Sequence, residues 1–415
     1  MGIVFAGFAL LALGVLVAGN WYLWRRLFRD TTRGPGLARR AGVAVVAGGW
    51  VLAIGAVVGE RAGAPFWLQQ VLAWPGFLWL ALSIYLLLGV VAGEVVRPLL
   101  RRFLERRARV TAAVPQSEPE PVPAGAVPPK PPGPEPDSAP APEPSRRLFV
   151  SRAVAGAAAV AAVGTVGYGT YGVLRGPRVK RVTVPLAKLP RAAHGYRIAV
   201  VSDIHLGPIL GRGFAQQVVD TINSTQPDIV AVVGDLVDGS VKDLGPAATP
   251  LRQLKAPSYF VTGNHEYFSG AEQWVEEVRR LGLLPLENAR TELPYFDLAG
   301  VNDIAGESEG QGPDFTRALG DRDTARACVL LAHQPVQIHD AVKHGVDLQL
   351  SGHTHGGQLW PGNFIAAAAN PTVAGLERYG DTQLYVSRGA GAWGPPTRVG
   401  APSDITVIEL ASTRA

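Results

Sequence analysis

The chain has 415 residues, of which 47% are hydrophobic and 18% charged, with a formal net charge of +5 and a single cysteine, Cys328. At roughly 100–200 residues per domain, this length allows two or three domains and excludes a small disulfide-stapled scaffold. One cysteine also excludes an internal disulfide and a Cys-rich zinc or iron–sulfur site, so any metal must be held by His, Asp, Glu or Asn.

The charge is divided unequally along the chain. Residues 1–181 carry 21 Lys and Arg against 9 Asp and Glu, whereas residues 182–415 carry 18 against 25. The arginines of the first part lie beside long apolar runs, which is typical of membrane flanks and not of a groove for phosphate backbones. We therefore expect the soluble chemistry in the acidic second part, and no nucleic acid as its partner.

Residues 1–110 are predicted to form a three-helix transmembrane region. The segments 3–24, 41–59 and 73–96 are nearly free of charge and about long enough to cross a hydrocarbon core of ~30 Å. Arginines cluster between the first two segments and after the third, whereas residues 60–72 hold only Glu60 and Arg61. The positive-inside bias then places the Arg-rich segments in the cytoplasm and the N-terminus outside. The alternative for any one run is a buried core helix.

Residues 111–144 are dominated by Pro, Ala, Glu and Gly, a composition that predicts a semi-rigid linker without a core. The region 145–181 then pairs Arg146 and Arg147 with a charge-free run from Ala153 to Leu174. It resembles a twin-arginine export signal, which would make the twin-arginine translocation machinery a partner. The alternative is a fourth ordinary span. Both interpretations predict a multi-pass protein of the cytoplasmic membrane with residues 182–415 on its outer face, and we expect the span to remain as an anchor.

From residue 182, short apolar runs alternate with amphipathic stretches. Helical spacing of Phe214, Val218 and Ile222 predicts one helix, and Trp274 and Val278 mark another. Together with the predicted strands, this pattern indicates a mixed α/β sheet system with helices on its outer faces. The predicted strands are 197–202, 228–234, 258–262, 296–301, 327–332, 347–350, 383–387 and 405–410.

Short polar clusters directly follow five of these strands. Loops beyond the carboxyl ends of strands line the crevice where open α/β sheets bind ligands, so we expect the clusters to share one rim. They read Asp203-Ile204-His205, Gly234-Asp235, Gly263-Asn264-His265-Glu266, His333 and Gly352-His353-Thr354-His355-Gly356-Gly357.

These clusters have the composition of a metal site. Asp203 and His205 lie two apart in a segment predicted to be extended, so their side chains project to one side and can chelate one ion. The carboxylate of Asp235 can bridge two cations, and Asn264 offers a neutral oxygen. Imidazole, carboxylate and amide ligands without thiolate suit manganese, iron or zinc. Each cluster alone favours a cap, a turn or a core histidine over a site. The ordered set of five favours a site.

The order Asp-x-His, Gly-Asp, Gly-Asn-His-Glu, His, Gly-His-x-His resembles the calcineurin-like metallophosphoesterase superfamily. Residues Gly352–Gln358, Ser387-Arg388-Gly389 and Trp393-Gly394-Pro395-Pro396 are similar to its membrane-associated bacterial YkuE/YaeI-type branch. The resemblance covers about residues 195–411 and implies a two-sheet sandwich flanked by helices, built as an α/β catalytic domain behind an all-α transmembrane region.

The resemblance also implies roles for individual residues. Asp203, His205, Asp235 and His355 would hold one metal, and Asp235, Asn264, His333 and His353 a second. His265 would act near the leaving-group or phosphoryl oxygens, and Glu266 would orient His265. Arg388 is a candidate substrate contact, with a structural ion pair as the alternative.

The resulting hypothesis is a membrane-anchored phosphoesterase that uses two divalent or trivalent metal ions. Two cations ~3.5–4 Å apart make a shared water acidic enough to supply a bridging hydroxide near neutral pH, which attacks a phosphomonoester or phosphodiester. Phospholipid and cell-envelope phosphates are candidate substrates because of the location alone. The alternative is a metal-binding sensor or scaffold module without turnover. A nuclease is disfavoured by the acidic domain. The surface charge around the rim should discriminate further, since a positive collar would favour nucleic acid and an apolar one lipid.

Overall fold

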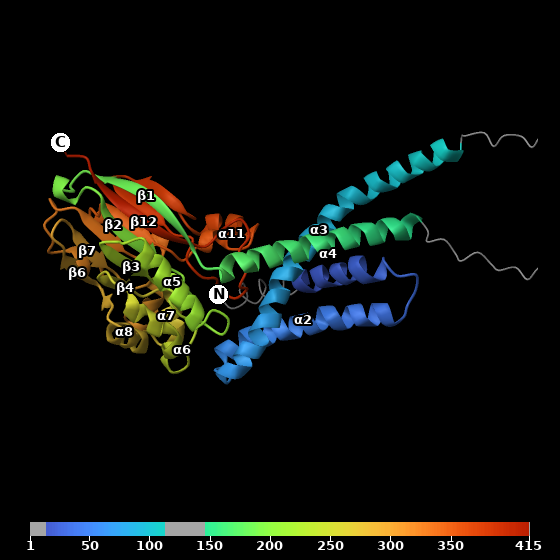
Figure 1. Cartoon of the computed structure of the whole chain (residues 1–415), viewed down its shortest axis with the longest axis horizontal. Helices are drawn as coiled ribbons and strands as arrows, with labels where there is room; N and C mark the ends of the chain where they lie inside the picture. Colours follow the sequence, from blue (N-terminus) through green and yellow to red (C-terminus); the bar gives the residue numbers. More distant parts are fainter. Residues whose placement is uncertain (1–13, 113–145, 415) are drawn as a thin grey trace, which may run out of the picture. The chain divides into compact units, whose positions relative to one another are not determined.

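The computed structural model describes residues 14–112 and 146–414, of which residues 108–112 are described for their backbone alone. The chain forms two compact units (Figure 1). The first comprises Met1–Gly48 and Ser83–Val163, and the second comprises Gly49–Leu82 and Gly164–Ala415. Each is described by itself below. The predicted linker at 111–144 and residues 3–13 of the first predicted span lie almost entirely outside the described residues.

Long apolar helices dominate the N-terminal part of the chain. Residues 14–24 are helical and continue into a π-helical turn at Arg25–Arg29. The helices α2 (Leu37–Arg61), α3 (Phe66–Ala112) and α4 (Arg146–Leu174) follow. In the described part of the chain, these three are long and apolar enough to cross a membrane, and they contain the second, third and fourth predicted spans.

Within the first unit, glycines let α3 and α4 approach closely. A Cβ at Gly89 would lie 3.1 Å from the Cβ of Ala158, which is tighter than ordinary side-chain contact. Small residues of this kind allow helix backbones to pack in lipid, where no hydrophobic force draws helices together. Glu94 also binds two arginines, Arg26 at 2.6 Å and Arg97 at 2.9 Å, so its charge is compensated.

The second unit contains two six-stranded mixed sheets. The first sheet has the order β1-β12-β2-β3-β4-β5, and the second has the order β10-β11-β9-β8-β7-β6. Strands β2, β3, β4 and β5 are parallel, as are β7, β8, β9 and β11. The strands of the first sheet are β1 (Arg178–Leu186), β2 (Tyr196–Val201), β3 (Ile229–Val233), β4 (Ser258–Val261), β5 (Leu284–Pro285) and β12 (Asp404–Ser412). Those of the second are β6 (Ala289–Glu292), β7 (Asp297–Gly300), β8 (Cys328–Leu331), β9 (Leu348–Ser351), β10 (Gly375–Tyr379) and β11 (Thr382–Val386).

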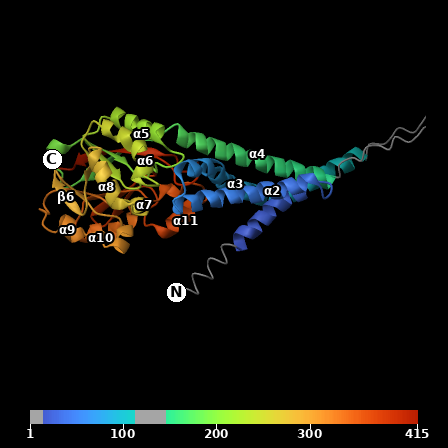
Figure 2. The same ribbon diagram turned by 90° about the horizontal axis from the view of Figure 1, so that it is seen from below.

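Three apolar clusters hold this domain together. One lies between the two sheets and joins Ile198 and Val233 of the first to Val329 and Leu350 of the second. The other two lie outside the sandwich, against helices on opposite faces, so that α5 and α10 stand on opposite sides in Figure 2. The helices are α5 (Arg212–Ser224), α6 (Val241–Ala248), α7 (Asn264–Ser269), α8 (Ala271–Arg280), α9 (Phe315–Leu319), α10 (Ile338–Lys343) and α11 (Gly362–Ala369), with 3₁₀ turns at Arg191–Ala193, Thr249–Gln253, Ile304–Glu309, Pro335–Gln337 and His355–Gly357.

The predicted two-sheet sandwich flanked by helices is confirmed. All eight predicted strands are present within one or two residues, and the two predicted helices are α5 and α8. Strands β1, β5, β6 and β10 were not predicted. Strand β1 begins at Arg178, within the segment interpreted as a basic flank of the fourth span. It was missed because its first residues are largely exposed and its buried residues begin only at Val184.

Candidate metal centre

The predicted site residues come together where the two sheets present the carboxyl ends of their parallel strands. Asp203 and His205 follow β2, Asp235 follows β3, and Asn264 begins α7 after β4. His333 follows β8, and the pair His353 and His355 follows β9, so each sheet supplies part of the cluster.

The backbone at these ligand positions is unusual. Of eight described non-glycine residues with positive φ, five are predicted ligands, with φ between 49° and 70°: Asp203, His205, Asp235, His353 and His355. Such conformations are disfavoured for residues with a Cβ and persist only where surrounding contacts impose them. The expectation that Asp203 and His205 lie in an extended segment is therefore wrong. Their side chains converge because the chain turns sharply at the end of β2.

Two glycines of the sequence motifs have steric reasons to be glycine. Gly234 has φ +74°, and a Cβ there would lie 2.6 Å from Nδ1 of His333. A Cβ at Gly352 would overlap the side chains of Ser202 and Asp203. Both positions let a ligand-bearing loop approach the neighbouring strand more closely than any other residue would allow.

One group of ligand atoms consists of Asp203, His205 and His355. Their ligand atoms all lie within 4.8 Å of one another, and all three residues are buried. His355 Nε2 lies 3.3 Å from Asp203 Oδ1 and 3.0 Å from His205 Nε2. Nδ1 of His205 is bound to Asp238 Oδ1 at 2.9 Å, an arrangement that leaves Nε2 of His205 available as a ligand.

A second group consists of Asp235, His333 and His353. Nε2 of His333 lies 3.1 Å from Asp235 Oδ2, and Nδ1 of His353 lies 2.9 Å from Asn264 Oδ1. Asp235 stands between the two groups, because the same Oδ2 atom lies 3.8 Å from Nε2 of His205. The predicted bridging position of Asp235 therefore has a geometric counterpart.

The cluster fits a pair of cations. His333 donates from Nδ1 to the carbonyl oxygen of Val233 at 2.8 Å, so its Nε2 carries a lone pair. That Nε2 atom is buried, has no hydrogen-bond partner among the described residues and faces the Asp235 carboxylate. A ring nitrogen and carboxylate oxygens turned toward one another in a buried space form an arrangement that a cation between them would satisfy. The donor set of nitrogen and oxygen without sulfur suits manganese, iron or zinc.

His265 lies beside this cluster and is held by Asp238. Nδ1 of His265 is 2.7 Å from the same Asp238 Oδ1 that binds His205. Burial lowers the pKa of His265, but the hydrogen bond to Asp238 and the charges of Asp238 and Asp235 outweigh it and raise this pKa to about 9. Burial raises the pKa of Asp238, but the two imidazoles outweigh it and lower that pKa to about 2. The result is a charged imidazole next to the ligand cluster.

Sequence reasoning assigned no role to Asp238. It assigned Glu266 the role of orienting His265, and the structure corrects this. The Glu266 carboxylate accepts hydrogen bonds from the backbone N–H groups of Asp235, Leu236 and Gly263, at 2.9, 2.8 and 2.6 Å. Glu266 thus fixes the loop that carries Asp235, and Asp238 fixes His265. Asp238 and Glu266 are both carboxylates within three residues of a predicted ligand. The sequence therefore holds no signal that tells which of them fixes the loop and which fixes His265.

Two arginines differ in their relation to the cluster. Arg398, which sequence reasoning missed, is buried and donates to the His355 carbonyl oxygen at 3.0 Å and to Nδ1 of the same residue at 3.2 Å. Arg388 is more exposed and lies 4.0 Å from Asp404 Oδ2, which favours the ion-pair alternative for it. His194, His339 and His344 belong neither to the two ligand groups nor to the further group of possible ligands formed by His205, Asp238 and His265.

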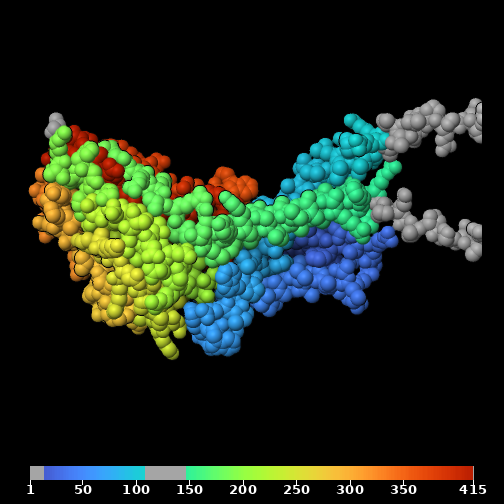
Figure 3. Space-filling view, viewed as in Figure 1, coloured from blue at the N-terminus to red at the C-terminus, as the bar shows by residue number. Residues whose placement is uncertain are grey.

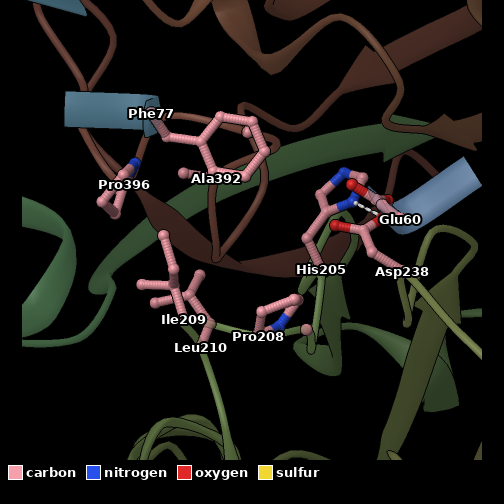
Figure 4. A pocket seen from close by; sticks show the side chains of 11 residues that line it. Glu60, Phe77, His205, Pro208, Ile209, Leu210, Asp238, Ala392 and Pro396 are labelled. Atoms are coloured by element: carbon pink, nitrogen blue, oxygen red, sulfur yellow. Dashed lines mark hydrogen bonds and ion pairs between the residues drawn. The ribbon is translucent and has the colours of Figure 1, made fainter. Parts of the chain in front are cut away.

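A small cavity of about 20 Å³ opens beside the cluster, within the second unit. Figure 4 shows its polar end, where Glu60 lies near His205 and Asp238, and its apolar end, where Phe77 faces Ile209 and Pro396. Glu60 and Phe77 come from the ends of α2 and α3 that pack with the domain. The described lining of the cavity contains no Lys or Arg, and its residues are Glu60, Phe77, His205, Gly207, Pro208, Ile209, Leu210, Asp238, Ala392, Gly394 and Pro396.

Comparison with known proteins identifies relatives of this domain. Residues 196–357 match the family described as calcineurin-like phosphoesterase. A Danio rerio protein named "Transmembrane protein with metallophosphoesterase domain" is 40% identical over 260 residues, which are 59% of each chain. An Aquifex aeolicus protein named "Uncharacterized metallophosphoesterase" is 35% identical over 240 residues, or 56% of this chain and 91% of that one.

A third relative, the Bacillus subtilis "Uncharacterized metallophosphoesterase YkuE", is 29% identical over 285 residues, which are 65% of this chain and 98% of that one. The present chain spans about three fifths of the length of the Danio rerio relative. The similarity therefore concerns the domain that carries the cluster.

Proposed function

Since the chain belongs to the calcineurin-like metallophosphoesterase family, a family with dinuclear metal centres, we propose that it hydrolyses phosphate esters with two metal ions held by the seven ligands above. The observation that carries the proposal is the position of Asp235, whose Oδ2 lies 3.1 Å from Nε2 of His333 and 3.8 Å from Nε2 of His205. One carboxylate between two ligand groups is the arrangement that a pair of bridged cations needs.

The chemistry divides between the ions and the residues around them. When bound, the two cations supply an acidic water and neutralise charge on the phosphoryl oxygens. His265 supplies the proton for the departing oxygen from Nε2, because its Nδ1 is bound to Asp238. Asp238 positions His265 and His205 together, while Arg398 fixes the loop of His355. Arg388 is a further candidate for contact with substrate phosphate.

The location forms part of the same proposal. The apolar helices α2, α3 and α4 anchor the chain in the cytoplasmic membrane as a multi-pass protein. The arginine distribution supports an outer-face position for the catalytic domain, and the pair Arg146 and Arg147 before the apolar run of α4 supports a twin-arginine signal. The twin-arginine translocation machinery is then the transport partner of the domain.

The test is hydrolysis by the full chain in nanodiscs, loaded with manganese, iron or zinc. The substrates are p-nitrophenyl phosphate and bis(p-nitrophenyl) phosphate, which separate monoesterase from diesterase activity. We expect metal-dependent turnover of at least one. Bound metal without turnover of either ester, at a level equal to that of Asp235→Asn, would instead support the alternative, a metal-binding sensor or scaffold module.

A further inference from the structure

The imidazole of His265 is flanked by two exposed aromatic side chains. The ring of Phe268 lies 5.6 Å from it and that of Trp393 lies 5.7 Å from it, both edge-on. Phe268 is 75% exposed and Trp393 is 51% exposed. Large apolar rings that remain in water beside a reactive group are unfavourable unless they bind something apolar.

The cavity beside the cluster continues this apolar character. Phe77, Ile209, Leu210 and Ala392 form its wall, and its charged groups are the acidic Glu60 and Asp238. A polyanionic substrate would meet no attraction from such a lining, because phosphate backbones bind to Lys and Arg. A volume of about 20 Å³ admits about one water molecule, so the cavity supports the inference through the apolar character of its exposed walls alone.

The segment that follows His355 adds an exposed apolar helix. Residues 356–376 contain no charged side chain, and within them α11 exposes Phe364 by 65% and Ile365 by 76%. The helix is joined to the metal cluster, because the backbones of Gly357 and Asn363 are in direct contact. Its atoms form part of the molecular surface in the space-filling view (Figure 3). A helix that exposes Phe and Ile with no charged side chain beside them presents an apolar surface that a lipid interface would cover.

The last turns of α4 lie at the same end of the domain as the cluster. Thr170 and Thr397 are hydrogen-bonded at 2.7 Å, and the backbone N–H of Arg398 donates to the carbonyl of Gly169 at 3.3 Å. Arg398 in turn holds His355. Residues 175–177 alone separate α4 from β1. A helix with the length and composition of a membrane span thus ends within two contacts of the ligands, and in Figures 1 and 2 α11 lies on the side of the domain from which α4 departs.

We propose that the substrate is a phosphate ester carried on a lipid of the bilayer, with α11 inserted into the interface. The side chains of Phe268, Trp393 and Phe77, which form the rim of the site, contact the apolar part of this lipid. This inference rests on the proposed function and names its substrate class. The phosphate lies over the ligand cluster while its apolar body remains near lipid, so the substrate need not leave the membrane.

The position of α11 is tested first, without reference to activity. The full chain is labelled with bimane at Phe364→Cys and placed in nanodiscs that contain lipids spin-labelled near the top of the acyl chain. Cys328 is buried, so the introduced cysteine is the one that reacts. Insertion to a depth of about 5–10 Å predicts strong quenching. The matched control is Leu284→Cys, an exposed residue of β5 at the opposite edge of the sheet from β1, which is expected to show none.

The substrate class is tested by chain length at a constant reacting bond. The full chain is given ethyl and octyl p-nitrophenyl phosphates as diesters, and ethyl and octyl phosphates as monoesters, all below the concentration at which the octyl esters form micelles. Each buried methylene group favours binding by about fourfold, so partial burial of the octyl chain predicts a kcat/KM at least about tenfold above that of the ethyl ester.

The outcomes separate this inference from the proposed function. Turnover of both chain lengths at equal kcat/KM, or a bimane on Phe364→Cys that is quenched no more than that on Leu284→Cys, would overturn the lipid assignment while the esterase stands. Absence of turnover for every ester with every metal would overturn the proposed function. The quenching result would in that case still decide whether α11 lies in lipid.

Discussion

The ligand cluster and the rim around it differ in burial, polarity and backbone conformation. The cluster is buried, polar and conformationally strained, with five of its side chains on residues of positive φ. The rim is exposed and apolar, and its aromatic side chains Phe268 and Trp393 contact His265 by their ring edges. A residue in the cluster has no freedom to serve another purpose, because its neighbours hold it through several contacts at once. An exposed residue of the rim contacts few neighbours, so its side chain can determine which substrate binds.

This contrast leads to different expectations for substitutions. A change in the cluster should reduce turnover of every ester by the same factor, because it removes chemistry that all substrates share. A change in the rim should alter the ratio between substrates. The four predictions below run from the centre of the cluster outward, and from the largest expected effect to the smallest.

The largest effect is expected at Asp235. The substitution Asp235→Asn removes the negative charge of the carboxylate that lies between the two ligand groups. It should lower kcat/KM by at least about 10³-fold for every ester. The bound metal should fall below two ions for each chain, as measured by elemental analysis after gel filtration. Asp381→Asn, at a fully exposed residue, is the matched control and should retain both. Two retained ions with normal turnover in Asp235→Asn would contradict the bridging assignment.

His265 tests whether the cluster includes a proton donor. The substitution His265→Gln should leave two bound ions but lower the turnover of ethyl phosphate by about 10²-fold, because an alkoxide needs a proton to depart. The loss should be smaller for p-nitrophenyl phosphate, whose leaving group departs without one. Equal losses for the two substrates would assign His265 to the phosphoryl oxygens instead of the leaving group.

Asp238 has the intermediate position of a residue that acts through two others. Asp238→Asn keeps the size of the side chain but removes the charge that His205 and His265 share, and such outer partners contribute about 10–10² in metal affinity or activity. We expect weaker metal binding by titration and, at saturating metal, a greater loss for ethyl phosphate than for p-nitrophenyl phosphate. A variant that loses thermal stability alone, with both of these readouts unchanged, would show a structural role.

Much of the fold, and the convergence of the candidate ligands at one edge of the sheets, could be predicted because their signals are local. Apolar periodicity gave the strands, and the motifs joined each ligand to the end of a strand, where the chain must turn. Strand β1 was missed because its first residues are largely exposed, and α11 because none of its residues is buried. An element with no buried face leaves no amphipathic pattern in the sequence.

The residues that position the ligands could not be predicted in the same way. Asp238 lies in a turn of ordinary composition, and Arg398 lies 43 residues beyond the His355 that it binds. Their contacts with the histidines depend on how the two sheets pack, and no local sequence pattern indicates them. The positive φ of Asp203 and His205 is similarly imposed by tertiary contacts, since neither residue type prefers it.

The smallest effect is expected at the rim, and it distinguishes the rim from the cluster. Trp393→Ala removes an apolar ring that lies 5.7 Å from His265 but supplies no metal ligand. Octyl esters should lose part of their advantage over ethyl esters, by about threefold to tenfold, because the loss of one aromatic contact removes about one kcal/mol of binding. Trp393→Phe should restore most of it, since a ring of similar character remains. If Trp393→Ala lowered the turnover of both chain lengths equally, the ring would serve to hold His265, and the rim would belong with the cluster after all.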